Sequence, residues 1–240
     1  MSRIFFTGDT HAEFRRFSSK NFPIGKELTY DDYVIILGDF GGFWDNSKQD
    51  AYWMGWLESK DFNIVFLPGN HENYSILNNI SRYIYMEMWG GKVRQFGRNI
   101  FMLQNGETYR INGKTYLVMG GGLSIDKSMR KENISWWKEE YPTISDWNKF
   151  EKNCQENDFT FDFILSHVPP LFILEKMIKA DITNEKVKDE VAIRLGDFMG
   201  KLKFTKWLFG HMHQNVVIHQ NYICLYEDII EDVEAEQMFY

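Results

Sequence analysis

The sequence predicts an α/β fold, because short apolar runs alternate with helix-like segments along most of the chain. Each apolar run contains β-branched and aromatic residues and ends in a turn, which is typical of a buried strand. The five runs are RIFFTGD (3–9), YVIILGD (33–39), NIVFLPGN (63–70), FDFILSH (161–167) and KWLFGH (206–211). Helix-like patterns between them cover about 11–20, 48–60, 73–81, 143–155 and 185–202.

The central stretch 99–122, NIFMLQNGETYRINGKTYLVMGGG, departs from this alternation and predicts consecutive strands. Asn112-Gly113 is the preferred pair of a type I′ hairpin turn, so part of the sheet should be antiparallel. The letters NGKT also end like a Walker A loop. Thr108 stands where that motif needs glycine, so we interpret the stretch as a hairpin.

The segment 124–142, SIDKSMRKENISWWKEEYP, predicts a long excursion from the sheet, and such loops often carry function. Lys127, Arg130 and Lys131 could contact a phosphoryl group, but we favour a solvated loop. Trp136 and Trp137 are better explained by packing than by base stacking.

Length and composition predict one globular domain over residues 1–240, with 44% hydrophobic and 17% aromatic residues. A formal net charge of -7 disfavours nucleic acid as a partner, although a local basic pocket would still permit it. Cys154 and Cys224 fit no disulfide framework, and the N-terminus has no signal-peptide pattern, so we expect a cytoplasmic protein. No apolar run is long enough to cross a membrane.

Polar side chains cluster where the predicted strands end, which is the edge where α/β sheets bind ligands. Five of the six histidines lie at these ends, and only His219 does not. Glycine precedes four of the groups and permits sharp turns, at Gly8, Gly38, Gly69 and Gly210. The side chains concerned are Asp9, His11, Asp39, Asn70, His71, His167, His211 and His213.

Imidazole and carboxylate groups in this number indicate a site for divalent transition metals. No thiolate takes part, which disfavours a closed structural zinc site. The donors are too numerous for one ion with open positions, so two ions sharing one carboxylate fit better. His211 and His213 are two residues apart, so in an extended segment they point the same way and can reach neighbouring ions.

The blocks GDTH (8–11), GDFGG (38–42), GNHE (69–72), SH (166–167) and GHMH (210–213) together resemble the ordered signature of calcineurin-like metallophosphoesterases. The resemblance implies a four-layer αββα sandwich of two mixed β-sheets flanked by helices. It also implies two metal sites that share Asp39. One would have the ligands Asp9, His11, Asp39 and His213, and the other Asp39, Asn70, His167 and His211. His71 matches the family residue that contacts substrate phosphate and assists catalysis.

The function expected from this resemblance is metal-dependent hydrolysis of phosphate esters, with a metal-bridged hydroxide attacking phosphorus in line. Manganese is the favoured ion, and iron, zinc, nickel or cobalt are alternatives. The partner would be a small phosphorylated substrate or nucleotide, with monoester, diester and nucleotide left open. The oligomeric state is also open.

One departure from the family pattern concerns the second block. The protein Ser/Thr phosphatase branch carries an arginine there, in the form GD-x-x-D-R-G, whereas this chain reads GDFGGFWDN. The substrate-phosphate clamp of that branch is therefore missing, which argues against protein phosphatase activity.

Other interpretations of these residues stay open. Taken singly, His167 could be a core histidine, Asp9 and Asp39 helix caps, and Asn70 a turn residue. The alternative for the whole protein is a catalytically silent member that uses the fold as a binding module.

Overall fold

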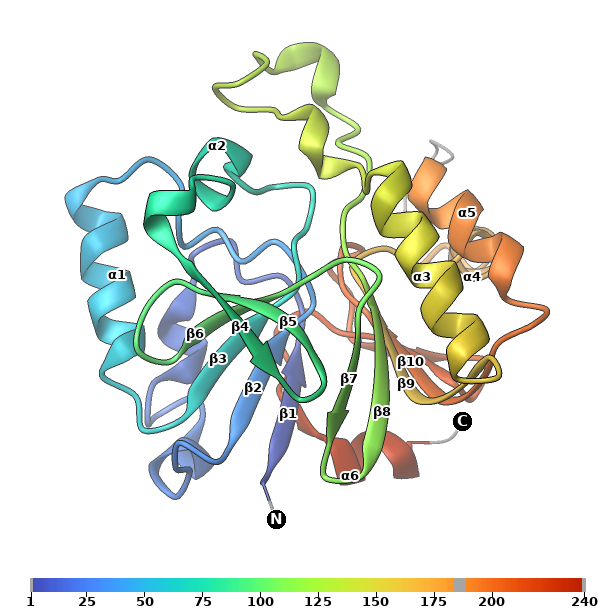
Figure 1. The fold of residues 1–240 in the computed structure, drawn as a ribbon, viewed down its shortest axis with the longest axis horizontal. Coiled ribbons are helices and arrows are strands. Elements are labelled where there is room, and N and C mark those ends of the chain that lie inside the picture. Colours follow the sequence, from blue (N-terminus) through green and yellow to red (C-terminus); the bar gives the residue numbers. More distant parts are fainter. Residues whose placement is uncertain (1, 184–188, 239–240) are drawn as a thin grey trace.

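Two β-sheets stacked face to face, with helices on their outer faces, form four layers in the computed structural model (Figure 1). The structure describes residues 2–183 and 189–238. This arrangement confirms the predicted α/β class and the sandwich of two mixed sheets.

The first sheet has seven strands, in the order β13-β1-β2-β3-β6-β5-β4. Its four central strands are parallel, whereas β13, β5 and β4 pair antiparallel. In this order the strands span Ile230–Glu231, Ile4–Thr7, Tyr33–Ile36, Asn63–Phe66, Ile100–Leu103, Gly91–Gln95 and Ile84–Met88.

The second sheet has six strands, in the order β11-β12-β10-β9-β8-β7. Strands β12, β10, β9 and β8 are parallel, and the two edge strands β11 and β7 pair antiparallel. In this order they span Val216–Ile218, Tyr222–Cys224, Lys203–Phe209, Thr160–Ser166, Lys114–Met119 and Thr108–Ile111.

Three apolar cores separate the four layers. The middle core lies between the sheets, where the ring of Phe163 is stacked on Tyr116 at 5.2 Å and lies 5.6 Å from Phe6. The outer face of the second sheet packs against α3 (Ile144–Glu156), α4 (Leu171–Lys179) and α5 (Glu190–Phe198). The outer face of the first sheet packs against α1 and two 3₁₀ helices, η1 and η2, which span Lys48–Glu58, Phe14–Phe17 and Pro23–Lys26.

Burial on both faces explains why the strands are continuous apolar runs without alternation. In β2, Ile35 belongs to the middle core, whereas Val34 and Ile36 belong to the core beneath α1. The hairpin is confirmed as well: Asn112 and Gly113 have φ of 53° and 79° and join β7 to the antiparallel β8.

The helix predictions succeed where the sequence supplies caps. Helix α1 begins after the N-cap Ser47, and α3 begins with a capping box between Thr143 and Asp146. Helix α5 lies within the predicted 185–202, of which residues 185–188 are outside the described residues.

Two helix predictions are wrong in extent. Only η1 forms within 11–20, because His11 and Ala12 have φ of 43° and 63° and cannot belong to a right-handed helix. The predicted 73–81 contains a short α2 (Tyr74–Leu77) and the 3₁₀ helix η3 (Ile80–Arg82).

The excursion 124–142 follows β8 and rises beyond the ends of the strands, between α2 and α3 (Figure 1, yellow-green). It contains two 3₁₀ helices, η4 (Lys127–Met129) and η5 (Lys138–Glu140). A short C-terminal helix α6 (Asp232–Gln237) lies at the opposite end of the sheets. None of the helices in the described part of the chain has the length and apolar character to cross a membrane.

Candidate metal centre

The predicted site residues come together at one edge of the sandwich, because parallel strands of both sheets end there. The first sheet supplies Asp9 after β1, Asp39 after β2 and Asn70 after β3. The second sheet supplies His167 after β9 and the pair His211 and His213 after β10. Residues from both sheets therefore converge on one place.

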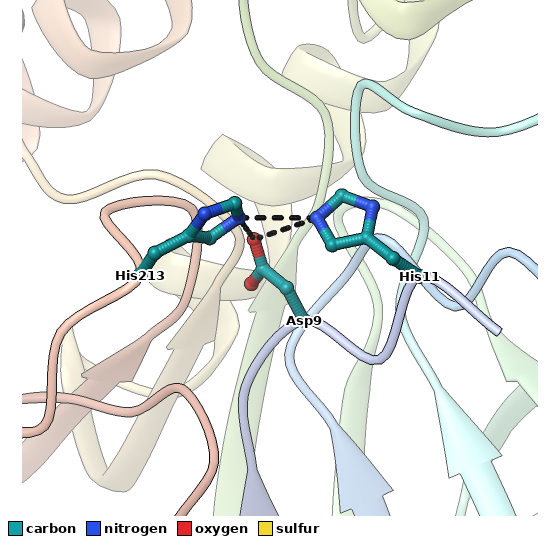
Figure 2. A group of neighbouring side chains, drawn as sticks. All are labelled: Asp9, His11 and His213. Atoms are coloured by element: carbon teal, nitrogen blue, oxygen red, sulfur yellow. Dashed lines mark hydrogen bonds and ion pairs between the residues drawn. The ribbon is translucent and has the colours of Figure 1, made fainter. Parts of the chain in front are cut away.

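Asp9, His11 and His213 form the first group of candidate ligands (Figure 2). Their ligand atoms all lie within 4.8 Å of one another. Nε2 of His213 lies 3.0 Å from Asp9 Oδ2 and 3.0 Å from Nε2 of His11, so both rings point at the carboxylate. Among the described residues, Asp9 Oδ2 is buried without a partner of hydrogen-bonding geometry. A buried carboxylate oxygen flanked by two imidazoles in this way suits a cation.

Asp9, Asp39 and His167 form the second group, and all three are buried. His167 Nδ1 lies 2.8 Å from the Leu37 carbonyl oxygen, which can only accept, so Nδ1 carries the hydrogen. In a neutral ring Nε2 is then an unprotonated acceptor, 2.9 Å from Asn70 Oδ1 and 3.4 Å from Asp39 Oδ1. Three acceptors this close suit a proton or a metal cation between them.

The electrostatics of the centre also favour positive charge. Burial lowers the pKa of His167, but the carboxylates of Asp39 and Asp9 outweigh it and hold this pKa above its ordinary value. Burial likewise raises the pKa of Asp9, but its contact with His213 and the nearby His167 outweigh it, so this pKa is lowered. The field that draws protons to the imidazoles would equally draw a divalent cation.

Asp39 belongs to the second group and also faces the first. Its Oδ2 is 3.6 Å from Nε2 of His11, and its Oδ1 is 3.4 Å from Nε2 of His167. The backbone N–H of His71 donates to the same Oδ1 at 2.7 Å, which holds the carboxylate in this orientation. Each oxygen of Asp39 thus faces a different group of ligands.

His211 and His71 lie at the margin of these groups. The ring of His211 is 4.9 Å from that of His167, and loss of hydration, with His167 nearby, lowers the pKa of His211 to about 3. A neutral imidazole of this kind is suited to metal coordination. The ring of His71 is 5.4 Å from that of His11, and His71 belongs to neither group.

At Gly38 and Gly210 a neighbouring side chain lies too close for any residue with a Cβ atom, so these glycines are needed for more than a sharp turn. A Cβ atom on Gly38 would lie 2.1 Å from His167 Nδ1, and one on Gly210 would lie 2.2 Å from Asp9 Oδ1. Asp39, His211 and His213 adopt φ of 48°, 63° and 50°, a conformation that few residues other than glycine adopt, although aspartate and histidine do so more often than most. Strain of this kind is typical of functional sites.

Glu72 is a supporting residue to which the sequence analysis gave no role, although it belongs to the block GNHE. It is buried and accepts the backbone N–H groups of Phe40 at 2.8 Å and Gly41 at 3.3 Å. Burial, with Asp39 nearby, raises its pKa to about 8. Glu72 thereby ties the loop after β2 to the loop after β3.

Ser124 and Glu140 are a second support, and no local signal predicts them. Asn70 donates its Nδ2 to Ser124 Oγ at 3.2 Å, and Ser124 Oγ donates to the buried Glu140 at 2.6 Å. These contacts assign the amide orientation, so that Asn70 Oδ1 faces His167. The two ends of the excursion therefore orient one candidate ligand.

Residues 2–215 match the family model described as calcineurin-like phosphoesterase. The chain belongs to the calcineurin-like phosphoesterase family. This membership supports metal-dependent phosphoester hydrolysis in general terms, and the Asp and His groups above are candidate ligands for divalent metals.

A similar fold is found among solved structures. The protein TT1561 of Thermus thermophilus aligns with a TM-score of 0.51 at 10% identity, covering 96% of this calcineurin-like phosphoesterase and 97% of that chain. A protein of unknown function from Aquifex aeolicus, AQ665, aligns with a TM-score of 0.38 at 12% identity, covering 99% of both chains. No curated protein matches the sequence.

Proposed function

We propose that the protein is a metal-dependent hydrolase of phosphate esters that works with two divalent cations. The observation that carries this proposal is the pair of ligand groups, each with its donor atoms within 4.8 Å, which share the buried carboxylate of Asp9 and meet at Asp39. Two groups of nitrogen and oxygen donors that share carboxylates fit a dinuclear centre.

Asp9, His11, Asp39 and His213 would hold one cation, and Asp39, Asn70, His167 and His211 the other. Neutral imidazole, carboxylate and amide donors suit manganese, with iron, zinc, nickel or cobalt as alternatives. Divalent cations here would lower the pKa of water and neutralise charge on a phosphoryl group. A small phosphate ester or nucleotide is the proposed substrate.

His71 would act on the substrate rather than hold metal. The backbone N–H of His71 donates to Asp39. The ring of His71 lies beside His11, and the two histidines line one pocket next to the metal centre. From this position, we propose, it donates a proton to the leaving oxygen or stabilises charge on the phosphoryl group. General acid catalysis of this kind contributes about 10²–10⁴-fold to a rate.

A panel assay tests the proposal. Manganese-loaded protein is offered p-nitrophenyl phosphate, bis-p-nitrophenyl phosphate, cyclic nucleotides, dinucleoside polyphosphates and a phosphopeptide, and the same protein is assayed after chelation. We expect hydrolysis that requires metal and that Asp39→Asn abolishes. The matched control is His219→Asn, because His219 is exposed, lies outside the site and has a φ of 51°, which asparagine tolerates.

Two outcomes would count against this function. Hydrolysis that survives complete removal of metal would refute the metal-dependent chemistry. Tight metal binding without hydrolysis of any ester in the panel would favour the binding-module alternative.

A further inference from the structure

A pocket of about 390 Å³ opens beside the candidate metal centre. His11 and His71 line the end nearest the metal ligands, and Trp44 and Asp50 line the wall made by the loop 41–50. Arg130, from the excursion 124–142, also lines the pocket. An arginine therefore shares one cavity with the candidate ligand His11 and with His71, which the family resemblance places at the substrate phosphate.

The Arg130 side chain is held in place and is only 18% exposed. Its Nε lies 2.7 Å from Asp126 Oδ1, and its Nη1 donates to the Ser135 carbonyl oxygen at 3.0 Å. Within residues 2–183 and 189–238, Nη2 has no hydrogen-bond partner. The expectation of a solvated side chain is thus wrong for Arg130. Its guanidinium is held in one orientation, and the N–H groups of Nη2 remain available to a ligand.

The excursion that carries Arg130 is docked on the rest of the site. Trp137 packs edge-to-face on Trp44 with ring centroids 5.7 Å apart, and its Nε1 donates to Ser75 Oγ at 2.7 Å. Trp136 and Trp137 are both buried, as the sequence analysis expected. Since these contacts join the excursion to Trp44 and to α2, the two walls of the pocket are fixed relative to each other.

We propose that Arg130 binds the phosphoryl group of the substrate and makes the enzyme prefer phosphate monoesters to diesters. The inference rests on the proposed function and deepens it. The loop 41–50 belongs to the block where protein Ser/Thr phosphatases carry their arginine, and this chain has none there. Arg130 supplies a guanidinium to the same pocket from the excursion instead.

The preference for monoesters follows from counting phosphate oxygens. A monoester phosphoryl group has three non-bridging oxygens, whereas a diester has two. If each of the two cations took one of these oxygens, a monoester would keep one charged oxygen for Arg130 and a diester would keep none. A guanidinium is suited to this contact because its planar fork of N–H groups matches phosphate geometry.

Binding of inorganic phosphate to manganese-loaded protein, measured by calorimetry, tests the contact without requiring turnover. Arg130→Gln should weaken phosphate binding by about 10- to 100-fold, the range of a lost hydrogen bond to a charged group. Lys131→Gln is the matched control, because it removes the same charge from the next, exposed residue and should change nothing. Arg130→Lys should recover part of the affinity, since it restores the charge without the fork.

Kinetics with two esters test the selectivity. Arg130→Gln should lower kcat/KM for p-nitrophenyl phosphate by about 10- to 100-fold, mainly through KM, because the contact is made in the ground state as well. For bis-p-nitrophenyl phosphate the loss should stay below about threefold. Metal content, measured alongside, should remain that of the wild type.

Three results would overturn the inference: unchanged phosphate binding in Arg130→Gln, loss of metal in that variant, or a lysine variant no better than the glutamine variant. An equal loss on both esters would overturn the selectivity. If the wild type hydrolyses no ester but binds phosphate through Arg130, the proposed function fails and the contact stands.

Discussion

Asp39 connects the two ligand groups. One of its carboxylate oxygens lies 3.6 Å from the imidazole of His11 in the first group, and the other lies 3.4 Å from that of His167 in the second. We therefore predict that Asp39→Asn lowers kcat more than Asp9→Asn and releases more metal. Both rates and bound manganese are measured on protein reconstituted in parallel. A variant Asp39→Asn with wild-type kcat and metal content would contradict the bridging role.

His71 should act in the chemistry rather than in metal retention, because its ring lies beside His11 and lines the pocket next to the metal centre. We predict that His71→Gln keeps both ions and lowers kcat by about 10²-fold or more. The loss should be larger for alkyl phosphates than for p-nitrophenyl phosphate, whose leaving group departs without a proton. Loss of metal would reassign His71 as a ligand, and equal losses would favour charge stabilisation.

For single residues, the sequence predicts the site best where a side chain follows a strand within a few residues. Asp9, Asp39 and Asn70 each stand a few residues beyond a buried run, so the fold brings them to one edge. Ser124 and Glu140 could not be predicted, because their contact crosses 16 residues of irregular chain. Arg130 is named from the sequence as a possible phosphoryl contact, but a solvated loop is favoured there, because its exposure depends on how the excursion docks.

Among the structural elements, the excursion 124–142 supports the metal centre through the residues at its two ends. We predict that Ser124→Ala weakens binding of one of the two ions by about 10- to 100-fold, because Asn70 loses the partner of its amide. Competition with a chelator measures the affinity of each ion. Ser128→Ala, exposed on the same excursion, is the control and should bind both ions as the wild type does. Equal affinities in the two variants would refute the role of Ser124.

The elements that the sequence analysis missed lack a side-chain cap or a long apolar run. Helix α4 begins directly after Pro169-Pro170, and its N-cap is Pro170 without a side-chain cap. The edge strands β4 and β11 are partly exposed and only five and three residues long, so no long apolar run marks them. Tertiary pairing, rather than local pattern, decides these segments.

On the scale of the whole molecule, the candidate centre joins the two sheets, since Asp39 follows a strand of one and His167 a strand of the other. Manganese should therefore stabilise the folded protein, by about 2.7 kcal/mol at 100 times Kd. For a chain of this size that corresponds to a rise in Tm of about 5–10 °C. Thermal unfolding of the protein with and without manganese measures this rise in Tm.

The controls for this shift are a ligand variant and a histidine outside the site. Asp39→Asn should lose most of the rise in Tm, whereas His219→Asn should keep it. A rise of equal size in both variants would mean that manganese stabilises the protein from another place.

The layered architecture was predictable only in part from local patterns. Alternating strands and helices indicate an α/β protein, but they do not divide the strands of the described chain between two sheets. That division depends on which faces pack in the middle core, such as Phe6 against Phe163, and is a property of the whole chain. The family resemblance carried the expectation of four layers.

The most direct test of the central claim is a titration of metal-free protein with manganese, with hydrolysis of p-nitrophenyl phosphate measured against bound ions per chain. We predict little activity at one equivalent and a plateau at two, because the proposed ligands of the two ions share Asp39 and both ions would serve one phosphoryl group. Full activity at one equivalent or at none would contradict the dinuclear account, and so would no activity at two.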